Sequence, residues 1–219
     1  MNPDLKQAQQ RKSQGPAASI SGFEHVMRYW DARRGLFAAK VLPGEFYVTR
    51  NEELVVTVLG SCIAACVFAP ELKVGGMNHF MLPHTGGNEQ FKFTRRPSTA
   101  TRYGTHAMEG LINEIVKLGV PKNQMQIKLF GGGKILQQMT DVGKRNIDFI
   151  HAYLEQETMT AAAEDLGGPH PRKVVLWPQT GRVQVKHLSR LDSGTVVKLE
   201  SSYESEIDRE KVASDVELF

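Results

Sequence analysis

The 219-residue sequence has few cysteines, no long apolar run and little net charge. Its apolar runs fall far short of the roughly 18 residues that cross a bilayer, which argues against membrane insertion. The polar N-terminus lacks the apolar segment of a signal peptide, and we therefore expect a cytoplasmic protein. A net charge of +3 is too small to indicate nucleic-acid binding.

The two cysteines of the chain are Cys62 and Cys66. On one strand they would lie about 13 Å apart, which is too far for a disulfide. Two cysteines without a second pair do not make a zinc site, and we expect neither a metal nor an organic cofactor. Cys66 follows Ala65 in an apolar run and is typical of a small core residue.

Strand patterns and helical patterns both occur along the chain. Apolar spacing of three and four predicts two long helices, one from Ser98 or Thr99 to Leu118 and one from Val142 to Glu157. The predicted class is α+β with prominent antiparallel pairs. Short apolar runs bounded by turn signals predict strands at residues 46–49, 54–59, 62–68, 73–82, 126–130, 174–177 and 182–188.

Both ends of the chain differ in composition from its middle. Residues 1–20 are rich in Gln, Ser and Lys, which predicts a disordered tail. Ser21 and Glu24 fit a helix capping box, which predicts a helical extension over residues 21–42. From Glu200 onward acids outnumber bases, so residues 191–219 form an acidic extension. We expect it to be solvated, with a docking tail that inserts Phe219 as the alternative.

A glycine triplet followed by Lys134 resembles part of a phosphate-binding loop. That motif requires an earlier glycine and a Ser or Thr directly after the lysine, whereas Ile135 stands there. Nucleotide binding is therefore not expected. A tight turn after the strand at 126–130, near the active site, is the better interpretation.

The stretch from Thr57 to Pro83 contains the candidate chemistry. A hairpin turn centred between Pro70 and Glu71 would pair residues whose numbers sum to 141, and Cys62 and His79 have this sum. Their side chains would then lie opposite each other on one face, about 5 Å apart at Cβ. A nearby imidazole lowers the pKa of a thiol and can transfer protons, which indicates a catalytic pair.

Three further residues complete this candidate site. Gly60 and Ser61 precede Cys62 in a turn where backbone N–H groups can converge on a ligand. Thr57 lies on the preceding predicted strand, and its hydroxyl can accept a hydrogen bond from an imidazole N–H. A strand at 54–59 lying beside the hairpin would make Thr57 the group that orients His79.

These segments resemble the CheD family of chemoreceptor glutamine deamidases. The resemblance covers residues 43–190, which we take as the deamidase domain. Its main carriers are the segments Leu59–Cys62 and Gly75–Pro83. Matching residues elsewhere are Tyr103-Gly104, Ala107-Met108, Lys128–Gly132, Gly143, Arg145-Asn146, Asp165–Gly168, Arg172-Lys173 and Thr180-Gly181.

The resemblance implies an activity, a fold and partners. It implies a Cys-His-Thr triad at Cys62, His79 and Thr57, in a layered α/β sandwich like that of the cytotoxic-necrotizing-factor toxins. The implied substrates are glutamines on the cytoplasmic helical bundle of methyl-accepting chemotaxis receptors, which become glutamates with release of ammonia. CheC is the implied protein partner.

Two other functions fit the same residues. The chain could bind receptor or CheC as an adaptor with little catalysis, although an intact Cys-His pair argues against this. A thiol esterase acting on receptor glutamyl methyl esters would use the same nucleophile.

Overall fold

The structure is a computed structural model that describes residues 3–83, 91, 93, 98–135, 142–189 and 193–216. For residues 3–6, 193, 197 and 208–216 it describes the backbone alone. No described helix has the length and apolar character needed to cross a membrane. The described elements, in chain order, are α1 (Pro3–Gln14), β1 (Arg28–Asp31), β2 (Leu36–Lys40), β3 (Phe46–Thr49), β4 (Leu54–Leu59), β5 (Ile63–Ala69), the 3-10 turn η1 (Pro70–Leu72), β6 (Val74–Asn78), α2 (Thr99–Lys117), the 3-10 turn η2 (Lys122–Gln124), β7 (Gln126–Gly131), α3 (Val142–Gln156), β8 (Ala161–Leu166), β9 (Arg172–Trp177), β10 (Arg182–His187) and α4 (Ser193–Val216).

The strands form two mixed sheets of five strands each. Sheet A has the order β1-β2-β4-β9-β10, and sheet B has the order β3-β6-β5-β7-β8. Most neighbouring strands are antiparallel, but β2 pairs with β4 and β7 pairs with β8 in parallel. Helices and largely antiparallel sheets in one chain agree with the predicted α+β class.

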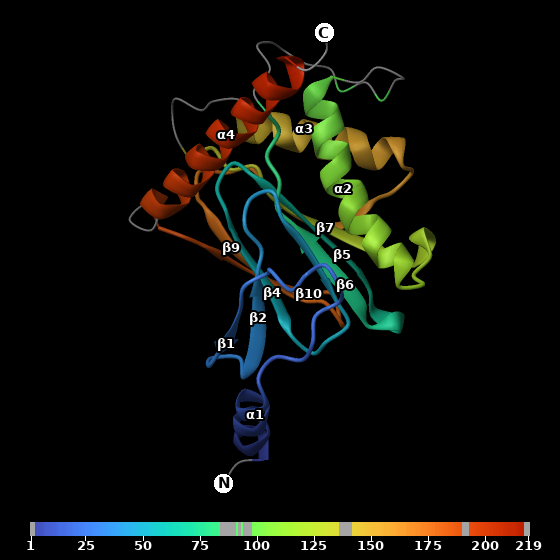
Figure 1. Cartoon of the computed structure of the whole chain (residues 1–219), viewed down its shortest axis with the longest axis vertical. Coiled ribbons are helices and arrows are strands. Elements are labelled where there is room, and N and C mark those ends of the chain that lie inside the picture. The colour runs from blue at the N-terminus through green and yellow to red at the C-terminus, as the bar shows by residue number, and fades with distance from the viewer. Residues whose placement is uncertain are drawn as a thin grey trace.

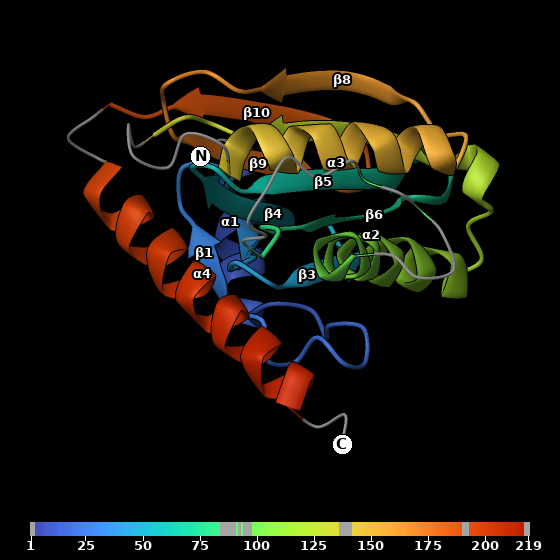
Figure 2. The same ribbon diagram turned by 90° about the horizontal axis from the view of Figure 1, so that it is seen from above.

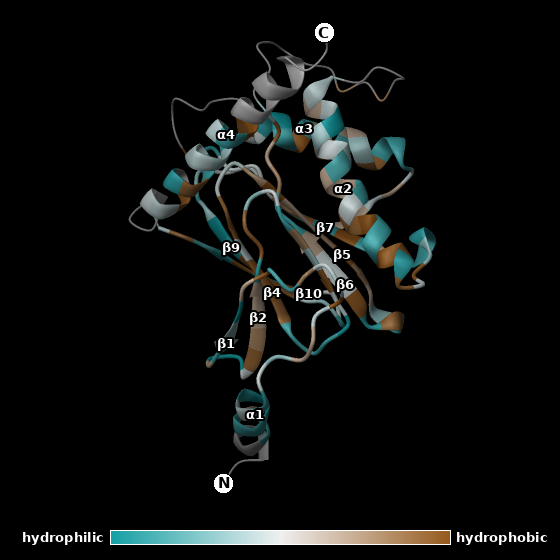
Figure 3. Cartoon of the chain, viewed as in Figure 1, coloured by the Kyte–Doolittle hydropathy of each residue, from teal (hydrophilic) through white to brown (hydrophobic). Residues whose placement is uncertain are grey.

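The layers follow from which faces of the elements are apolar. The α2 helix packs on β3 and β6 through a buried face that includes Met108, Leu111 and Ile115. The α3 helix lies beside it against β5, so both helices cover one face of sheet B (Figure 1; Figure 2). Every residue of β5 is buried, as expected for a strand enclosed on both faces. Figure 3 shows the apolar strands inside and the more polar helices outside.

The strand β4 shows how sheet A divides its side chains. Because alternate residues of a strand face opposite sides, Val55 and Leu59 join the main core while Leu54 and Val56 join a small cluster on the other side. Thr57 has the same parity as Val55 and Leu59. It therefore points inward, toward sheet B, and is almost fully buried.

The central predictions of secondary structure are confirmed. The predicted strands 46–49 and 54–59 coincide with β3 and β4, and the remaining predicted strands differ from β5, β6, β7, β9 and β10 mainly at their ends. The predicted first helix is α2, whose N-terminus is capped by the Ser98 side chain accepting from the Thr101 N–H. The second is α3. The strand β8 was not predicted, because its sequence Ala-Ala-Ala-Glu-Asp-Leu has no strand pattern.

The predicted helical extension at residues 21–42 is wrong. The chain forms the hairpin β1–β2 there, and the edge-to-face pair Trp30 and Phe37 joins the two strands. The Glu24 carboxylate accepts from the Gly22 N–H, so the predicted capping box does not start a helix. The β2 strand pairs with β4. Residues 28–40 thus belong to sheet A, and no separate unit ends at residue 42.

The predictions for the two ends of the chain also need correction. The tail predicted to be disordered contains α1, a polar helix in which Arg11 bonds to Glu52 beside sheet A. The acidic C-terminal extension contains α4, which is not simply solvated, because Val196, Glu200 and Ile207 are buried. Phe219, the residue proposed to insert, lies outside the described residues. The α4 helix crosses one end of the strands (Figure 1).

Candidate active site

The loop from Gly60 to Cys62 connects β4 of sheet A to β5 of sheet B. Its carbonyl groups are tied down by the segment after β7: the Gly132 N–H donates to the Cys62 carbonyl at 2.8 Å and the Gly133 N–H donates to the Gly60 carbonyl at 2.7 Å. The Asn146 amide of α3 donates to the Ser61 carbonyl at 2.9 Å. Because C=O and N–H point in opposite directions across a peptide bond, these contacts orient the N–H groups of the loop.

The glycines after β7 are required by this close approach. A Cβ on Gly131 would overlap the Cys62 carbonyl oxygen, and a Cβ on Gly133 would lie 2.7 Å from the Gly60 carbonyl oxygen. Gly131 also has a φ of 118°, which favours glycine. The triplet is therefore a tight turn that supports the cysteine loop, in agreement with the interpretation drawn from the sequence.

His79 directly follows β6 and is fixed by its backbone on both sides. Its N–H donates to the Glu45 carbonyl at 2.9 Å, and its carbonyl accepts from the Gly44 N–H at 2.8 Å. The ring is 2% exposed, and its Nδ1 lies 2.8 Å from the Thr57 hydroxyl oxygen. Two neighbouring segments thus hold the imidazole in one orientation.

The hydrogen bonds of Thr57 determine which nitrogen of His79 carries the proton. The Thr57 hydroxyl donates to the Val41 carbonyl at 2.8 Å, which uses its single proton. It must then accept from His79, so Nδ1 is protonated and Nε2 carries the lone pair. The Nε2 atom is buried and has no hydrogen-bond partner among the described residues.

The predicted hairpin register is wrong by two residues. Cys66 pairs with Met77 and Ala69 pairs with Val74, so paired numbers sum to 143 rather than 141. The cause is the turn, in which η1 and the left-handed Lys73 form a four-residue loop. A shift of two keeps every side chain on its face, which places Cys62 and His79 on a diagonal of the same face rather than directly opposite.

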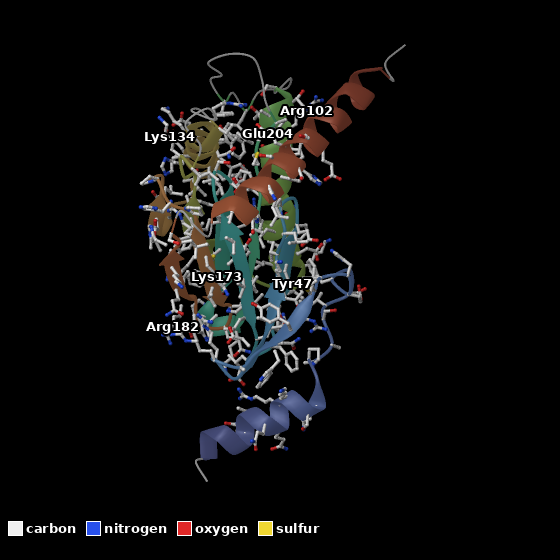
Figure 4. All side chains as sticks on the ribbon, turned by 90° about the vertical axis from the view of Figure 1, so that its left-hand side faces the viewer. Tyr47, Arg102, Lys134, Lys173, Arg182 and Glu204 are labelled. Atoms are coloured by element: carbon white, nitrogen blue, oxygen red, sulfur yellow. The ribbon has the colours of Figure 1, made fainter. Side chains whose placement is uncertain are left out.

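The structure nonetheless brings Cys62 and His79 together, along with a residue that sequence reasoning missed. Ligand atoms of Cys62, His79 and Glu200 all lie within 4.8 Å of one another. Glu200 comes from α4, which spans the end of the sheets, as Figure 4 shows with Glu204 labelled one helical turn further on. The available signal was a helical stripe in which one acid stands among apolar side chains: Val196, Glu200, Tyr203 and Ile207.

The Glu200 carboxylate is bound by the cysteine loop. One oxygen accepts from the N–H of Gly60 at 2.6 Å and of Cys62 at 3.2 Å. The other accepts from the Ser61 N–H at 2.7 Å and the Ser61 hydroxyl at 2.8 Å. The Gly60–Cys62 backbone is therefore an anion cradle, the arrangement that stabilises oxyanions in acyl transfer.

The group of Cys62, His79 and Glu200 has residue types that bind metals. A carboxylate has about four lone-pair sites, and the contacts with the loop already account for four. These donors bind an anion and leave Glu200 little capacity for a cation. The chemistry of the group therefore fits an oxyanion site better than a metal site.

Burial keeps both reacting groups un-ionised, and the Glu200 charge acts in the same direction on Cys62 but in the opposite direction on His79. Burial, and then the neighbouring Glu200 carboxylate, raise the pKa of the Cys62 thiol well above its usual value. Burial lowers the pKa of His79 to about 4, against a smaller opposing effect of Glu200. With α4 in place, the pair at neutral pH is a thiol beside a neutral imidazole.

The second cysteine is separate from this site. Cys66 is buried within β5, where it pairs with Met77 on one side and Lys128 on the other. Burial raises the pKa of its thiol far above the usual range, with Lys128 opposing. Both cysteines are free thiols. These contacts agree with the interpretation of Cys66 as a core residue.

A thiol beside an oriented imidazole, next to a cradle of backbone N–H groups, defines a candidate cysteine hydrolase site. Comparison with known proteins gives the family. The chain belongs to the CheD family: the family model described as "CheD chemotactic sensory transduction" matches residues 81–187. This match begins after Cys62 and His79, so it does not include these two residues. Relatives that match a longer part of the chain are needed to cover them.

Full-length relatives match the chain over almost all of its length. It is 52% identical over 200 residues to the "Probable chemoreceptor glutamine deamidase CheD" of Halorhodospira halophila, covering 91% of this chain and 93% of the relative. It is 45% identical over 210 residues to the protein of the same name in Hahella chejuensis, covering 96% and 98%. The similarity therefore includes the segments that form the site.

Proposed function

We propose that this protein hydrolyses the carboxamide of particular glutamine side chains in chemoreceptors, giving glutamate and ammonia. The observation that carries the proposal is the meeting of the Cys62 thiol, the His79 imidazole and the anion cradle of residues 60–62. The relatives named as chemoreceptor glutamine deamidases supply the substrate class.

In the proposed first step the Cys62 thiol gives its proton to Nε2 of His79, and the thiolate attacks the carboxamide carbon. The carboxamide oxygen becomes an oxyanion that accepts hydrogen bonds from the N–H groups of Gly60, Ser61 and Cys62. Each such donor is typically worth about 2.7–4 kcal/mol in the transition state. A free lone pair on Nε2 supports the role of His79 as the base.

In the second step the His79 imidazolium donates its proton to the leaving amine, and ammonia departs from a γ-glutamyl thioester. His79 then accepts a proton from water, which attacks the thioester and releases glutamate and the thiol.

Thr57 is proposed as a positioning residue that acts through His79. By accepting from Nδ1–H it holds the tautomer whose Nε2 can take the thiol proton. A neutral hydroxyl here stabilises the imidazolium less than a carboxylate would. Restraint of the ring orientation is therefore its main contribution.

Three broader expectations accompany the proposal. The layered sheets and helices support a fold like that of the cytotoxic-necrotizing-factor toxins. A nucleophilic thiol requires reducing conditions, which supports action in the cytoplasm. CheC remains the proposed partner, and co-purification of the two proteins would test that pairing.

Mass spectrometry of receptor peptides tests the activity. Deamidation adds one dalton to a glutamine, ester hydrolysis removes a methyl group, and an adaptor changes neither mass. We expect the one-dalton gain with the natural protein, its loss in Cys62→Ala, and its retention in Cys66→Ala as the matched control. A Cys62→Ala variant that still deamidates receptor would overturn the mechanism.

A further inference from the structure

The buried acid of α4 lies where the proposed reaction forms its product. A side chain with the γ-carboxylate of glutamate is bound by the three N–H groups assigned to the oxyanion. We infer that α4 is an intramolecular product mimic, which occupies the groove of the substrate helix with Glu200 in the place of the reacted side chain. This inference rests on the proposed function and adds to it how the site is closed and what sequence it recognises.

The contacts of Glu200 are specific to a side chain of this type. Its two oxygens take up both the backbone cradle and the Ser61 hydroxyl, at 2.6–3.2 Å. A glutamate newly formed on a receptor helix would present the same carboxylate to the same donors. An Asp would be one methylene shorter, and a helix carrying it would have to approach more closely.

Burial gives an independent argument that α4 must move. Cys62 is 0% exposed and His79 is 2% exposed. The substrate is a side chain on another protein, so the thiol has to become accessible before reaction. Glu200 lies against both residues. The helix that carries Glu200 is therefore the part of the chain that has to leave.

The way α4 is seated resembles helix-in-groove recognition. Val196 and Ile207 are buried four residues before and seven residues after Glu200, which places all three on one face. Between them the Tyr203 hydroxyl bonds to the Tyr103 hydroxyl of α2. A substrate helix in this groove would place apolar side chains four residues before and seven residues after its reactive glutamine.

Charge makes the docked helix inhibitory as well as obstructive. A carboxylate beside Cys62 disfavours the thiolate, whereas the neutral carboxamide of a substrate does not. Glu200 therefore fills the cradle and adds to the effect of burial in raising the pKa of the Cys62 thiol. Departure of α4 removes both effects at once.

Glu200→Gln gives the direct test, because it converts the mimic of the product into a substrate. Cys62 of the same chain should catalyse hydrolysis of the new carboxamide by water, which gives glutamate and ammonia. The residue at position 200 then gains one dalton. The double variant Glu200→Gln with Cys62→Ala controls for spontaneous deamidation. Glu206→Gln, at an exposed position of the same helix, should keep its glutamine.

The outcomes separate this inference from the proposed function. Cys62-dependent conversion of the introduced glutamine to glutamate supports the inference. An introduced glutamine that persists in a preparation that deamidates receptor overturns the inference and leaves the function standing. A preparation that converts neither the introduced glutamine nor receptor glutamines overturns the proposed function, and the inference with it.

Thiol labelling provides a readout that does not depend on catalysis. In Glu200→Ala we expect iodoacetamide to modify Cys62 at least tenfold faster than in the natural protein. Cys66 is the internal reference and should stay unreactive, and Glu206→Ala is the matched variant. An unchanged Cys62 labelling rate in Glu200→Ala would show that α4 does not close the site.

Discussion

The hydroxyl oxygen of Thr57 lies 2.8 Å from Nδ1 of His79, and the hydroxyl proton is already donated to the Val41 carbonyl. The contact with His79 joins β4 of sheet A to the residue that follows β6 of sheet B. The two contacts also fix one tautomer of the imidazole, with its lone pair on Nε2.

Thr57→Val removes this acceptor while keeping the shape of the side chain. We expect kcat for receptor deamidation to fall with KM little changed, because the ring loses its fixed orientation and tautomer, and the loss should not exceed the roughly 10²–10⁴-fold that general acid–base catalysis contributes. Thr57→Ser retains a hydroxyl and should recover most of the activity. Equal losses in the Val and Ser variants would assign Thr57 to packing alone.

His79 should make folding stability depend on pH. Its pKa is lowered to about 4 by burial, whereas in the unfolded chain it is near 6.5. Above about pH 6.5 His79 is neutral in both the folded and the unfolded chain, and its protonation takes nothing from the free energy of unfolding. Between pH 6.5 and 4 the unfolded state binds a proton that the folded state does not. The free energy of unfolding therefore decreases as the pH is lowered through this range, by up to about 3 kcal/mol.

Urea unfolding at a series of pH values measures this dependence. The comparison variant is His79→Gln, which cannot take up the proton. The difference between the two proteins should be flat above about pH 7 and decrease toward pH 4. Parallel curves for the two proteins would mean that His79 is not buried in its neutral form.

Asn146 is expected to matter for activity although it lies behind the cysteine loop. Its amide donates to the Ser61 carbonyl, and its oxygen accepts from the Leu82 N–H. Asn146→Ala leaves two buried backbone groups without partners, at about 1–3 kcal/mol for each group. It also releases the loop that presents the cradle.

Two measurements distinguish these effects in Asn146→Ala. Denaturant unfolding should show the loss of stability, and kcat should fall at a temperature where the variant remains folded. Asn113→Ala, at an exposed position of α2, serves as the control. An Asn146→Ala variant with lower stability but normal kcat would restrict Asn146 to a structural role.

Local patterns account for most of the core and for the two central site residues. The strand 54–59, and with it the inward parity of Thr57, could be predicted because one apolar run determines both. The hairpin register could not, since it depends on the left-handed conformation of Lys73 in the turn. The error did not separate Cys62 from His79, because a shift of two residues preserves the face.

The features that could not be predicted from the sequence depend on contacts between residues far apart in the chain. The segment 28–40 forms strands because β2 pairs with β4, although Phe23, Met27 and Trp30 have helical spacing. Glu200 lies 138 residues from Cys62, and nothing local to either residue indicates their contact. An acidic tail and an acid that fills an active site have the same composition, and only the fold distinguishes them.

Seating of α4 can be tested through its apolar contacts. In the Glu200→Gln background, Val196→Asp should slow conversion of the introduced glutamine about tenfold or more, because a buried carboxylate opposes docking of the helix. Leu199→Asp is the matched control, since Leu199 is 47% exposed and its charge would remain in water. Peptide mass spectrometry over time gives both rates.

Receptor deamidation by the Val196→Asp protein should be unchanged or faster, because the competing helix is released while Cys62 and His79 are intact. Equal conversion at position 200 in the Val196→Asp and Leu199→Asp proteins would mean that the stripe of Val196 and Ile207 does not seat the helix.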